Sequence, residues 1–315
     1  MALVGVVGVL SMTACDFVLD PRLDQLVGTG PFGAMATVER DLPYGTVLGC
    51  DGNDAFCGGS QELDVHLATP PPSDGSRPRH GVLVWLHGGG WTGGDKATDI
   101  PANVLRQLDR GWDVVSVNYR LSPHVSFPAP LLDAKLAIRW VKTHADHYGW
   151  DLDRLVVIGY SAGGNLAAMA AVTSGVPTLE PTPTDDLSAV DSSVVAAVAM
   201  NGVLDLNDAA RRNGFGHAIV SGYVGCTGCR QADLASPGWW VDRGDAPLYL
   251  VQGKDDPWAP SKQALDLCIA GRLRSLPCHM DLVDTGPVEG RGHDSGPSLN
   301  QASLDAFVDR ATLQR

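Results

Sequence analysis

The segment Gly159-Tyr160-Ser161-Ala162-Gly163 has the residue types that nucleophilic catalysis needs. It fits the pattern G-x-S-x-G, in which a glycine two residues either side of a serine permits a tight turn. The apolar run 154–158 predicts a strand before the turn, and the Ala-rich run 162–173 predicts a helix after it. Such a turn places a hydroxyl near the positive end of a helix, so we expect Ser161 to be a nucleophile. The alternative is a serine in an accidental Gly-rich turn.

A second glycine-rich segment, His87-Gly88-Gly89-Gly90-Trp91, directly follows the apolar run at 82–86. Three consecutive glycines let backbone N–H groups turn inward and approach a developing oxyanion closely. The N–H of Ala162, one residue past the expected nucleophile, is predicted to supply another donor. In hydrolases with this kind of turn, the base comes last in the chain. We therefore interpret His87 as an anchor for its loop.

Three histidines follow the expected nucleophile and could act as its base: His217, His279 and His293. His279 begins a predicted strand, where packing or a hydrogen bond at the strand edge explains it. His217 lies in a stretch without strand periodicity. His293 lies in the Gly-rich segment 289–296, after the last predicted strand, and a loop there can return an imidazole to the serine. We expect His293 to be the general base.

The acid of such a site should follow the strand predicted at 247–252. Its carboxylate must hold the neutral histidine tautomer and stabilise the imidazolium that forms. Asp255 and Asp256 both meet the positional requirement, and we favour Asp256. Asp205, one strand earlier, remains a further alternative.

Short apolar runs alternate with amphipathic stretches along most of the chain. Strands are expected at 62–68, 82–86, 113–117, 154–158, 194–200, 247–252 and 279–283, and helices at 100–110, 131–148, 162–173, 261–275 and 298–312. This alternation predicts an α/β fold with a mostly parallel central sheet flanked by helices. The strand at 62–68 alternates polar and apolar residues, as a half-buried strand does.

We expect the domain to cover residues 62–315, with an irregular or partly helical insertion over the site at about 203–245. Residues 16–61 are interpreted as an N-terminal arm that includes a loop. The net charge is −13, from 23 Lys and Arg against 36 Asp and Glu, without a cationic run. A nucleic-acid surface needs clustered cations, so we expect no nucleic-acid partner.

The first fourteen residues are apolar or small and carry no charged side chain. They are too few for a transmembrane helix, which needs about 20 apolar residues, and instead predict a signal peptide over residues 1–15. Met12-Thr13-Ala14-Cys15 resembles a bacterial lipobox, which implies lipidation at Cys15. We expect an exported protein of the cell envelope, anchored to the membrane only through this lipid. Secretion without an anchor is the alternative.

The other six cysteines form three near-neighbour pairs along the sequence. We expect disulfides between Cys50 and Cys57, Cys226 and Cys229, and Cys268 and Cys278, which would persist in an oxidising compartment. A structural zinc site at Cys226 and Cys229 would need a second pair of ligands, and the sequence has no second C-x-x-C or H-x-x-x-H motif. We therefore expect no metal.

Five ordered blocks resemble the esterase and lipase branch of the α/β-hydrolases, including hormone-sensitive-lipase-like and feruloyl-esterase-like carboxylesterases. They are HGGGWTGGDKA (87–97), NYRLSP (118–123), GYSAGGNLAA (159–168), GKDDPWAP (253–260) and GHDSG (292–296). The resemblance covers roughly residues 60–310. It implies the α/β-hydrolase fold, oxyanion donors at Gly88 and Gly89 beside Ala162, and Asp256, which immediately precedes a proline, as the acid.

The resemblance also implies a reaction. We expect hydrolysis of small or medium carboxylic esters through an acyl-enzyme on Ser161, without metal or organic cofactor. One alternative is an amide or formamide hydrolase that uses the same three residues. Another is a lipid-anchored binding protein that has kept the fold and lost the activity.

Overall fold

The computed structural model of the 315-residue chain describes residues 37–45, 61–68, 79–182, 186–212, 214–226, 228–284, 293 and 301–313. All of them lie in one compact unit, Ala36–Arg315. The predicted leader with Cys15, and the predicted pair Cys50 and Cys57, lie outside the described residues. Within those residues, no helix has both the length and the apolar character needed to cross a membrane.

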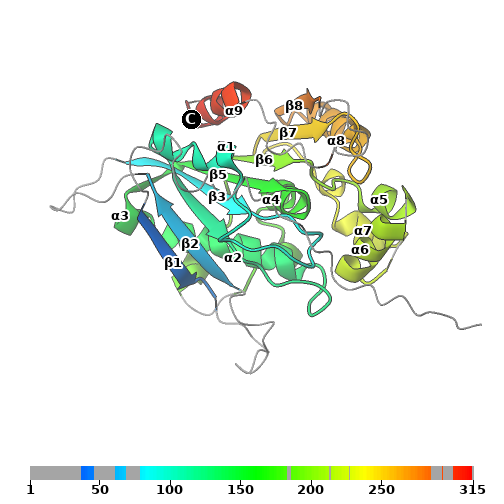
Figure 1. The fold of residues 1–315 in the computed structure, drawn as a ribbon, viewed down its shortest axis with the longest axis horizontal. Coiled ribbons are helices and arrows are strands. Elements are labelled where there is room, and N and C mark those ends of the chain that lie inside the picture. The colour runs from blue at the N-terminus through cyan, green and yellow to red at the C-terminus, as the bar shows by residue number, and fades with distance from the viewer. Residues whose placement is uncertain are drawn as a thin grey trace, which may run out of the picture. The chain divides into compact units, whose positions relative to one another are not determined.

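The described residues contain an eight-stranded sheet in the order β1-β2-β4-β3-β5-β6-β7-β8 (Figure 1). Its strands are β1 (Thr37–Pro43), β2 (Glu62–Leu67), β3 (His80–Leu86), β4 (Asp113–Val117), β5 (Trp150–Tyr160), β6 (Ala196–Met200), β7 (Leu248–Gly253) and β8 (Cys278–Val283). The pairings β1–β2 and β2–β4 are antiparallel, and all the others are parallel. The prediction of a mostly parallel sheet is confirmed.

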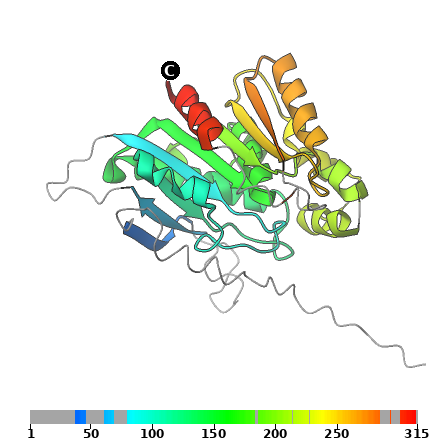
Figure 2. The same cartoon turned by 45° about the horizontal axis from the view of Figure 1, so that its top comes forward.

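Helices cover both faces of this sheet (Figures 1 and 2). The described helices are α1 (Ala102–Leu105), α2 (Ala129–Thr143), α3 (Ala145–Tyr148), α4 (Ala162–Val172), α5 (Leu206–Arg212), α6 (Gly214–Val224), α7 (Arg230–Leu234), α8 (Ser261–Leu273) and α9 (Gln301–Leu313). Buried side chains of α2, α4 and α8 form one hydrophobic core, and those of α1 and α9 form a second. The continuous apolar strands contribute to both cores, as expected for a sheet buried on both faces.

The structure differs from the sequence-based expectations at four elements. The helix expected at 100–110 is α1 followed by a short 3-10 helix, η1 (Leu108–Arg110), and the helix expected at 131–148 is divided at His144 into α2 and α3. Strand β1 lies within the stretch interpreted as an arm and a loop. Strand β2 is buried on both faces, so the expectation of a half-buried strand was wrong.

The polar side chains of β2 are buried because each has a partner inside the protein. Asp64 forms an ion pair with Lys96 at 2.7 Å, and Arg40 approaches the same carboxylate at 3.3 Å. His66 hydrogen-bonds to the hydroxyl of Ser116. Alternation of polar and apolar residues indicates a solvent-facing side only when the polar groups lack such partners.

The stretch expected as an insertion holds α5, α6, α7 and a short 3-10 helix, η4 (Pro237–Trp239). A disulfide joins Cys226 to Cys229 between α6 and α7, with Cα atoms 6.2 Å apart. A second disulfide joins Cys268 of α8 to Cys278 of β8, with Cα atoms 5.4 Å apart. These are two of the three predicted pairs.

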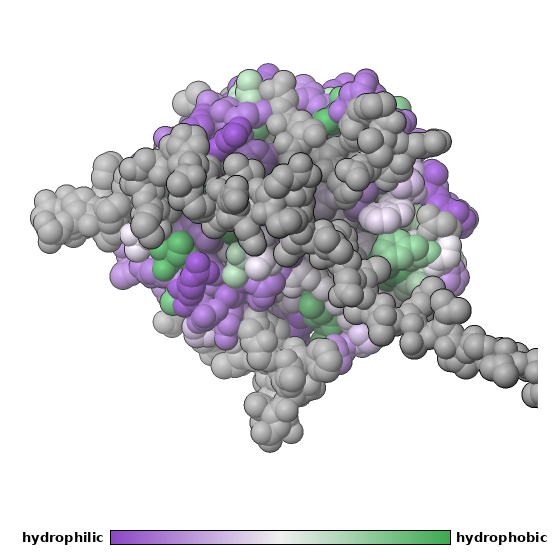
Figure 3. Space-filling model, viewed as in Figure 1, coloured by the Kyte–Doolittle hydropathy of each residue, from purple (hydrophilic) through white to green (hydrophobic). Residues whose placement is uncertain are grey.

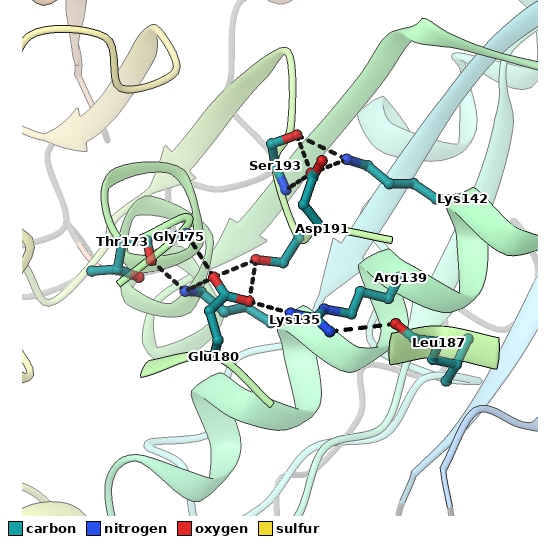
Figure 4. Close-up of polar contacts among 10 residues, drawn as sticks. Lys135, Arg139, Lys142, Thr173, Gly175, Glu180, Leu187, Asp191 and Ser193 are labelled. Atoms are coloured by element: carbon teal, nitrogen blue, oxygen red, sulfur yellow. Dashed lines mark hydrogen bonds and ion pairs between the residues drawn. The ribbon is translucent and has the colours of Figure 1, made fainter. Parts of the chain in front are cut away.

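A buried ion cluster, which we call the Glu180 cluster, ties α2 to the segment that follows α4 (Figure 4). The ammonium of Lys135 is fully buried and donates to the carbonyl of Thr173 at 2.6 Å and to Glu180 at 2.9 Å. Arg139 and Ser192 donate to the same carboxylate. Thr173 caps the C-terminal end of α4, where a cation is favourable. The cluster therefore fixes the far end of the helix that begins after Ser161.

Burial and ion pairing shift the pKa values of Glu180 and Lys135 in opposite directions. Burial alone would raise the pKa of Glu180, but its hydrogen bond to Lys135 and the lysine charge hold that pKa below its ordinary value of 4.5. Burial lowers the pKa of Lys135, and Glu180 offsets part of this effect. Because the pKa of Glu180 is lower in the folded chain than in the unfolded chain, its carboxylate stabilises the fold above about pH 4.5. This contribution is lost as the pH falls through the folded-state pKa.

Replacing Glu180 by glutamine should therefore lower the free energy of unfolding by about 3 kcal/mol at pH 7, because it leaves a buried lysine charge without its partner. The difference from wild type should shrink as the pH is lowered through the folded-state pKa of Glu180. Urea denaturation at pH 7 and at acid pH measures both effects.

The Lys142–Asp191 pair beside the cluster supplies a matched control, because Asp191 is 71% exposed (Figure 4). Asp191→Asn should change stability by less than about 1 kcal/mol. If Glu180→Gln were no more destabilising than Asp191→Asn at pH 7, the Glu180 cluster would not stabilise the fold as described.

Candidate active site

Ser161 lies in the turn between β5 and α4, at the carboxyl end of the parallel strands. Its backbone has φ 54° and ψ −115°, a conformation that non-glycine residues rarely adopt. Its N–H donates to the carbonyl of Met200 in β6 at 2.9 Å. A Cβ atom at Gly163 would lie 2.1 Å from the carbonyl oxygen of Leu86, so the turn packs too closely against β3 for a larger residue. The strained turn and its close packing fix the position of the serine.

The structure brings Ser161, His293 and Asp256 together in one chain of hydrogen bonds. The hydroxyl of Ser161 lies 2.8 Å from Nε2 of His293, and Nδ1 of His293 lies 2.8 Å from Oδ2 of Asp256. Since a carboxylate only accepts, Nδ1 carries the proton and Nε2 is free to accept from the serine. All three residues are buried. This is the arrangement that activates a serine nucleophile.

Asp256 is held by donors at both of its oxygens. The backbone N–H groups of Trp258 and Ala259 each donate to Oδ1 at 2.9 Å. The side chain of Gln252 donates to Oδ2 at 3.1 Å, beside the bond from His293. These four donors fix the orientation of the carboxylate.

The two alternative acids lie elsewhere. Asp255 is exposed. Asp205 accepts from the backbone N–H of Asp208 at 2.8 Å, which caps the start of α5. Of the three candidate aspartates, Asp256 bonds to His293.

The backbone of His293 has anchors that sequence reasoning missed. The Tyr160 hydroxyl donates to its carbonyl oxygen, and the side-chain amide of Asn201 donates to the same oxygen at 2.6 Å. Asn201 also accepts from the N–H of Gly253 at 3.2 Å. Its φ of 46° is a conformation that asparagine tolerates better than most residues. An asparagine directly after β6 was the available signal.

The predicted oxyanion donors lie beside Ser161. A Cβ atom at Gly88 would lie 3.4 Å from the Cβ of Ser161, and Gly89 has φ +99° with no room for a side chain against Gly93. In the part of the chain that the structure describes, the N–H groups of Gly88, Gly89 and Ala162 have no hydrogen-bond acceptor. They are therefore available to an oxyanion.

His87 holds this loop in place, as its position in the chain predicts. Its Nδ1–H donates to the carbonyl of Gly88 at 2.8 Å, and its ring stacks on Tyr119 at 4.3 Å. The Tyr119 hydroxyl donates to the His87 carbonyl at 2.8 Å. Burial lowers the pKa of His87, which keeps the imidazole neutral.

The other two candidate histidines do not join the site. His217 is exposed on α6, and His279 pairs with Asp281 at 3.1 Å on β8. Among the described residues, no group of three or more His, Cys, Asp or Glu side chains could hold a metal ion. Cys226 and Cys229, the candidate half of a zinc site, are bonded to each other.

Comparison with known proteins places the chain in a family. The BD-FAE family model matches residues 63–270, more than half of the chain and all of the site except His293. The chain belongs to the BD-FAE family. Its relatives include Esterase LipQ of Mycobacterium tuberculosis, 33% identical over 75% of this chain and 53% of LipQ. Esterase LipC of the same organism is 32% identical over 71% of this chain and 57% of LipC. This BD-FAE chain therefore spans about half the length of the curated relatives it matches.

Solved structures confirm the α/β-hydrolase fold for this BD-FAE chain. A truncated carbohydrate esterase from gut microbiota superimposes with a TM-score of 0.71 over 89% of this chain and 98% of its own, at 23% identity. The propionate-bound esterase Est2 of Thermogutta terrifontis gives a TM-score of 0.63 at 26% identity, over 88% of this chain and 94% of its own. The fold therefore extends beyond the residues that the family model matches.

Proposed function

We propose that this chain is a serine carboxylesterase that hydrolyses small or medium carboxylic esters through an acyl-enzyme on Ser161. The observation that carries the proposal is the hydrogen-bond chain from Ser161 through His293 to Asp256, beside three available backbone donors. The relatives LipQ and LipC are named esterases, which supports ester substrates over other acyl compounds.

In this mechanism, the Ser161 hydroxyl attacks the ester carbonyl carbon and transfers its proton to Nε2 of His293. The carbonyl oxygen becomes an oxyanion, which the N–H groups of Gly88, Gly89 and Ala162 stabilise. Asp256 stabilises the imidazolium. His293 then gives its proton to the leaving alkoxide, and the alcohol departs. Water, deprotonated by the same imidazole, attacks the acyl-enzyme and releases the acid.

Turnover and labelling test this proposal together. Purified protein should hydrolyse p-nitrophenyl acetate faster than p-nitroacetanilide, and a fluorophosphonate should label the peptide that contains Ser161. Faster anilide cleavage would instead favour the amide hydrolase. If the protein shows no turnover and no labelling, the result would favour a non-catalytic binding protein with the same fold.

We also propose that the protein is exported and anchored in the cell envelope through a lipid on Cys15. The two disulfides support an oxidising compartment, because such bonds are rare where thiols are kept reduced. The apolar leader that ends at Cys15 supports the anchor. Mass spectrometry of the mature protein should find a lipid-modified Cys15 at the N-terminus. A chain that begins at Met1 with seven free thiols would contradict both parts.

A further inference from the structure

Trp258 lies next to the imidazole of His293, and a second exposed aromatic side chain, Phe215, lies next to Trp258; we call these two side chains the aromatic pair. The ring of Trp258 lies 4.8 Å from the ring of His293 between centroids, and is 40% exposed. Phe215 of α6 lies 4.9 Å from Trp258 and is 52% exposed. Hydrophobic surface is also visible over the α5–α7 region, at the right of Figure 3. Apolar surface grouped in this way beside reacting groups favours a bound apolar ligand.

The aromatic pair is fixed relative to the reacting atoms from both sides. The backbone N–H of Trp258 donates to Asp256, so the same carboxylate positions both Trp258 and His293. Helix α6 packs at two points on the Gly-rich segment 87–91, which we call the oxyanion loop. The ring of Tyr223 stacks on Trp91 at 4.1 Å, and a Cβ atom at Gly90 would lie 3.0 Å from Ile219. Phe215 is thereby carried by a helix that contacts the oxyanion loop.

The side of the site on which the pair lies indicates which part of an ester it contacts. The carbonyl oxygen must point toward the N–H groups of the oxyanion loop. The leaving oxygen must point toward His293, which protonates it. A ring packed on His293 therefore lies nearer to the alcohol part than to the carbonyl oxygen. Aromatic rings interact most favourably with other planar apolar groups, in stacked or edge-to-face contact.

We propose that Phe215 and Trp258 bind the alcohol part of the ester and make the enzyme prefer esters of planar aromatic alcohols. This proposal rests on the proposed esterase function and adds the substrate class. Phe215 contacts the substrate without contacting the triad, so it determines specificity, whereas Trp258 contributes both to specificity and to the placement of His293.

A series of acetates with leaving groups of similar basicity tests this proposal: ethyl, cyclohexylmethyl and benzyl acetate. For the wild type, kcat/KM should rise along this series. Phe215→Ala should lower the ratio of kcat/KM for benzyl acetate to that for ethyl acetate by about fivefold, mainly through KM, as expected for the loss of one aromatic contact. Trp258→Leu should lower the same ratio, and Trp258→Phe should restore part of it. Trp239→Ala removes a similarly exposed ring in η4 outside the pair, and should leave the ratio unchanged.

A second series with ethanol as the constant alcohol distinguishes the two sides of the ester. Phe215→Ala should leave the ratio of ethyl phenylacetate to ethyl acetate unchanged. If that ratio falls instead, the pair binds the acyl part and the assignment is overturned. The assignment would also be overturned if folded Phe215→Ala and Trp258→Leu proteins had the same ratio of benzyl acetate to ethyl acetate kcat/KM as the wild type. The esterase proposal would then still stand. Absence of any ester turnover by the wild type would overturn both.

Discussion

Ser161→Ala is expected to reduce kcat for p-nitrophenyl acetate by about 10⁶-fold, as in serine hydrolases whose nucleophile is removed. The variant lacks the only atom that can form the acyl-enzyme, while His293, Asp256 and the backbone donors stay in place. Alanine keeps the Cβ atom at this strained position, so the melting temperature should stay close to that of the wild type. Steady-state kinetics and a thermal melt measure the two quantities.

Ser193→Ala is a matched control, because the Ser193 hydroxyl belongs to the exposed Lys142–Asp191 pair and not to the site. It should leave kcat within about twofold of the wild type, as expected for a surface substitution away from the reacting groups. Normal turnover by a folded Ser161→Ala protein would refute the assignment of the nucleophile.

Asp256→Asn is expected to lower kcat by about 10⁴-fold at neutral pH. Every hydrogen bond to the Asp256 carboxylate comes from a donor, and an asparagine side chain can accept at only one of its two ends. If the amide oxygen stays with the N–H groups of Trp258 and Ala259, the NH₂ group faces His293. The imidazole must then accept at Nδ1 and carry its proton on Nε2, where it cannot deprotonate Ser161.

The neighbouring Asp255 provides a matched control for this prediction. Asp255 is exposed, so Asp255→Asn should change kcat by less than about threefold, in keeping with small effects at surface positions. Comparison of kcat for the two variants, with circular dichroism to confirm folding, measures the difference. A greater loss for Asp255→Asn, or for Asp205→Asn, would show that another carboxylate is the acid.

The positions of Ser161 and Asp256 could be predicted from the sequence because Ser161 directly follows the buried parallel strand β5 and Asp256 lies three residues after the end of β7. Parallel strands bring their carboxyl ends to one edge of the sheet, so residues far apart in the sequence meet there. His293 could be predicted because it comes from a Gly-rich segment after the last strand. The oxyanion loop could be predicted because a backbone that turns this closely needs consecutive glycines.

Strand β1 could not be predicted, for a physical reason. It lies at the edge of the sheet and is mostly exposed or half-buried, so its sequence TVERDLP lacks the apolar pattern of the inner strands. The anchoring role of Asn201 could not be predicted either, for a different reason. Its amide bonds to Gly253 and His293, which lie 52 and 92 residues further along the chain. Such a role depends on which strand ends become neighbours, and residue spacing does not reveal it.

The anchoring of His293 bears on how this protein can evolve. Tyr160 and Asn201 hold its carbonyl, and Asp256 and Ser161 hold its ring. All four come from the ends of β5, β6 and β7, so the sheet itself locates the base. A substitution that shifts one of these strand ends should therefore displace the base as well, so selection for the base is expected to act on residues of three separate strands.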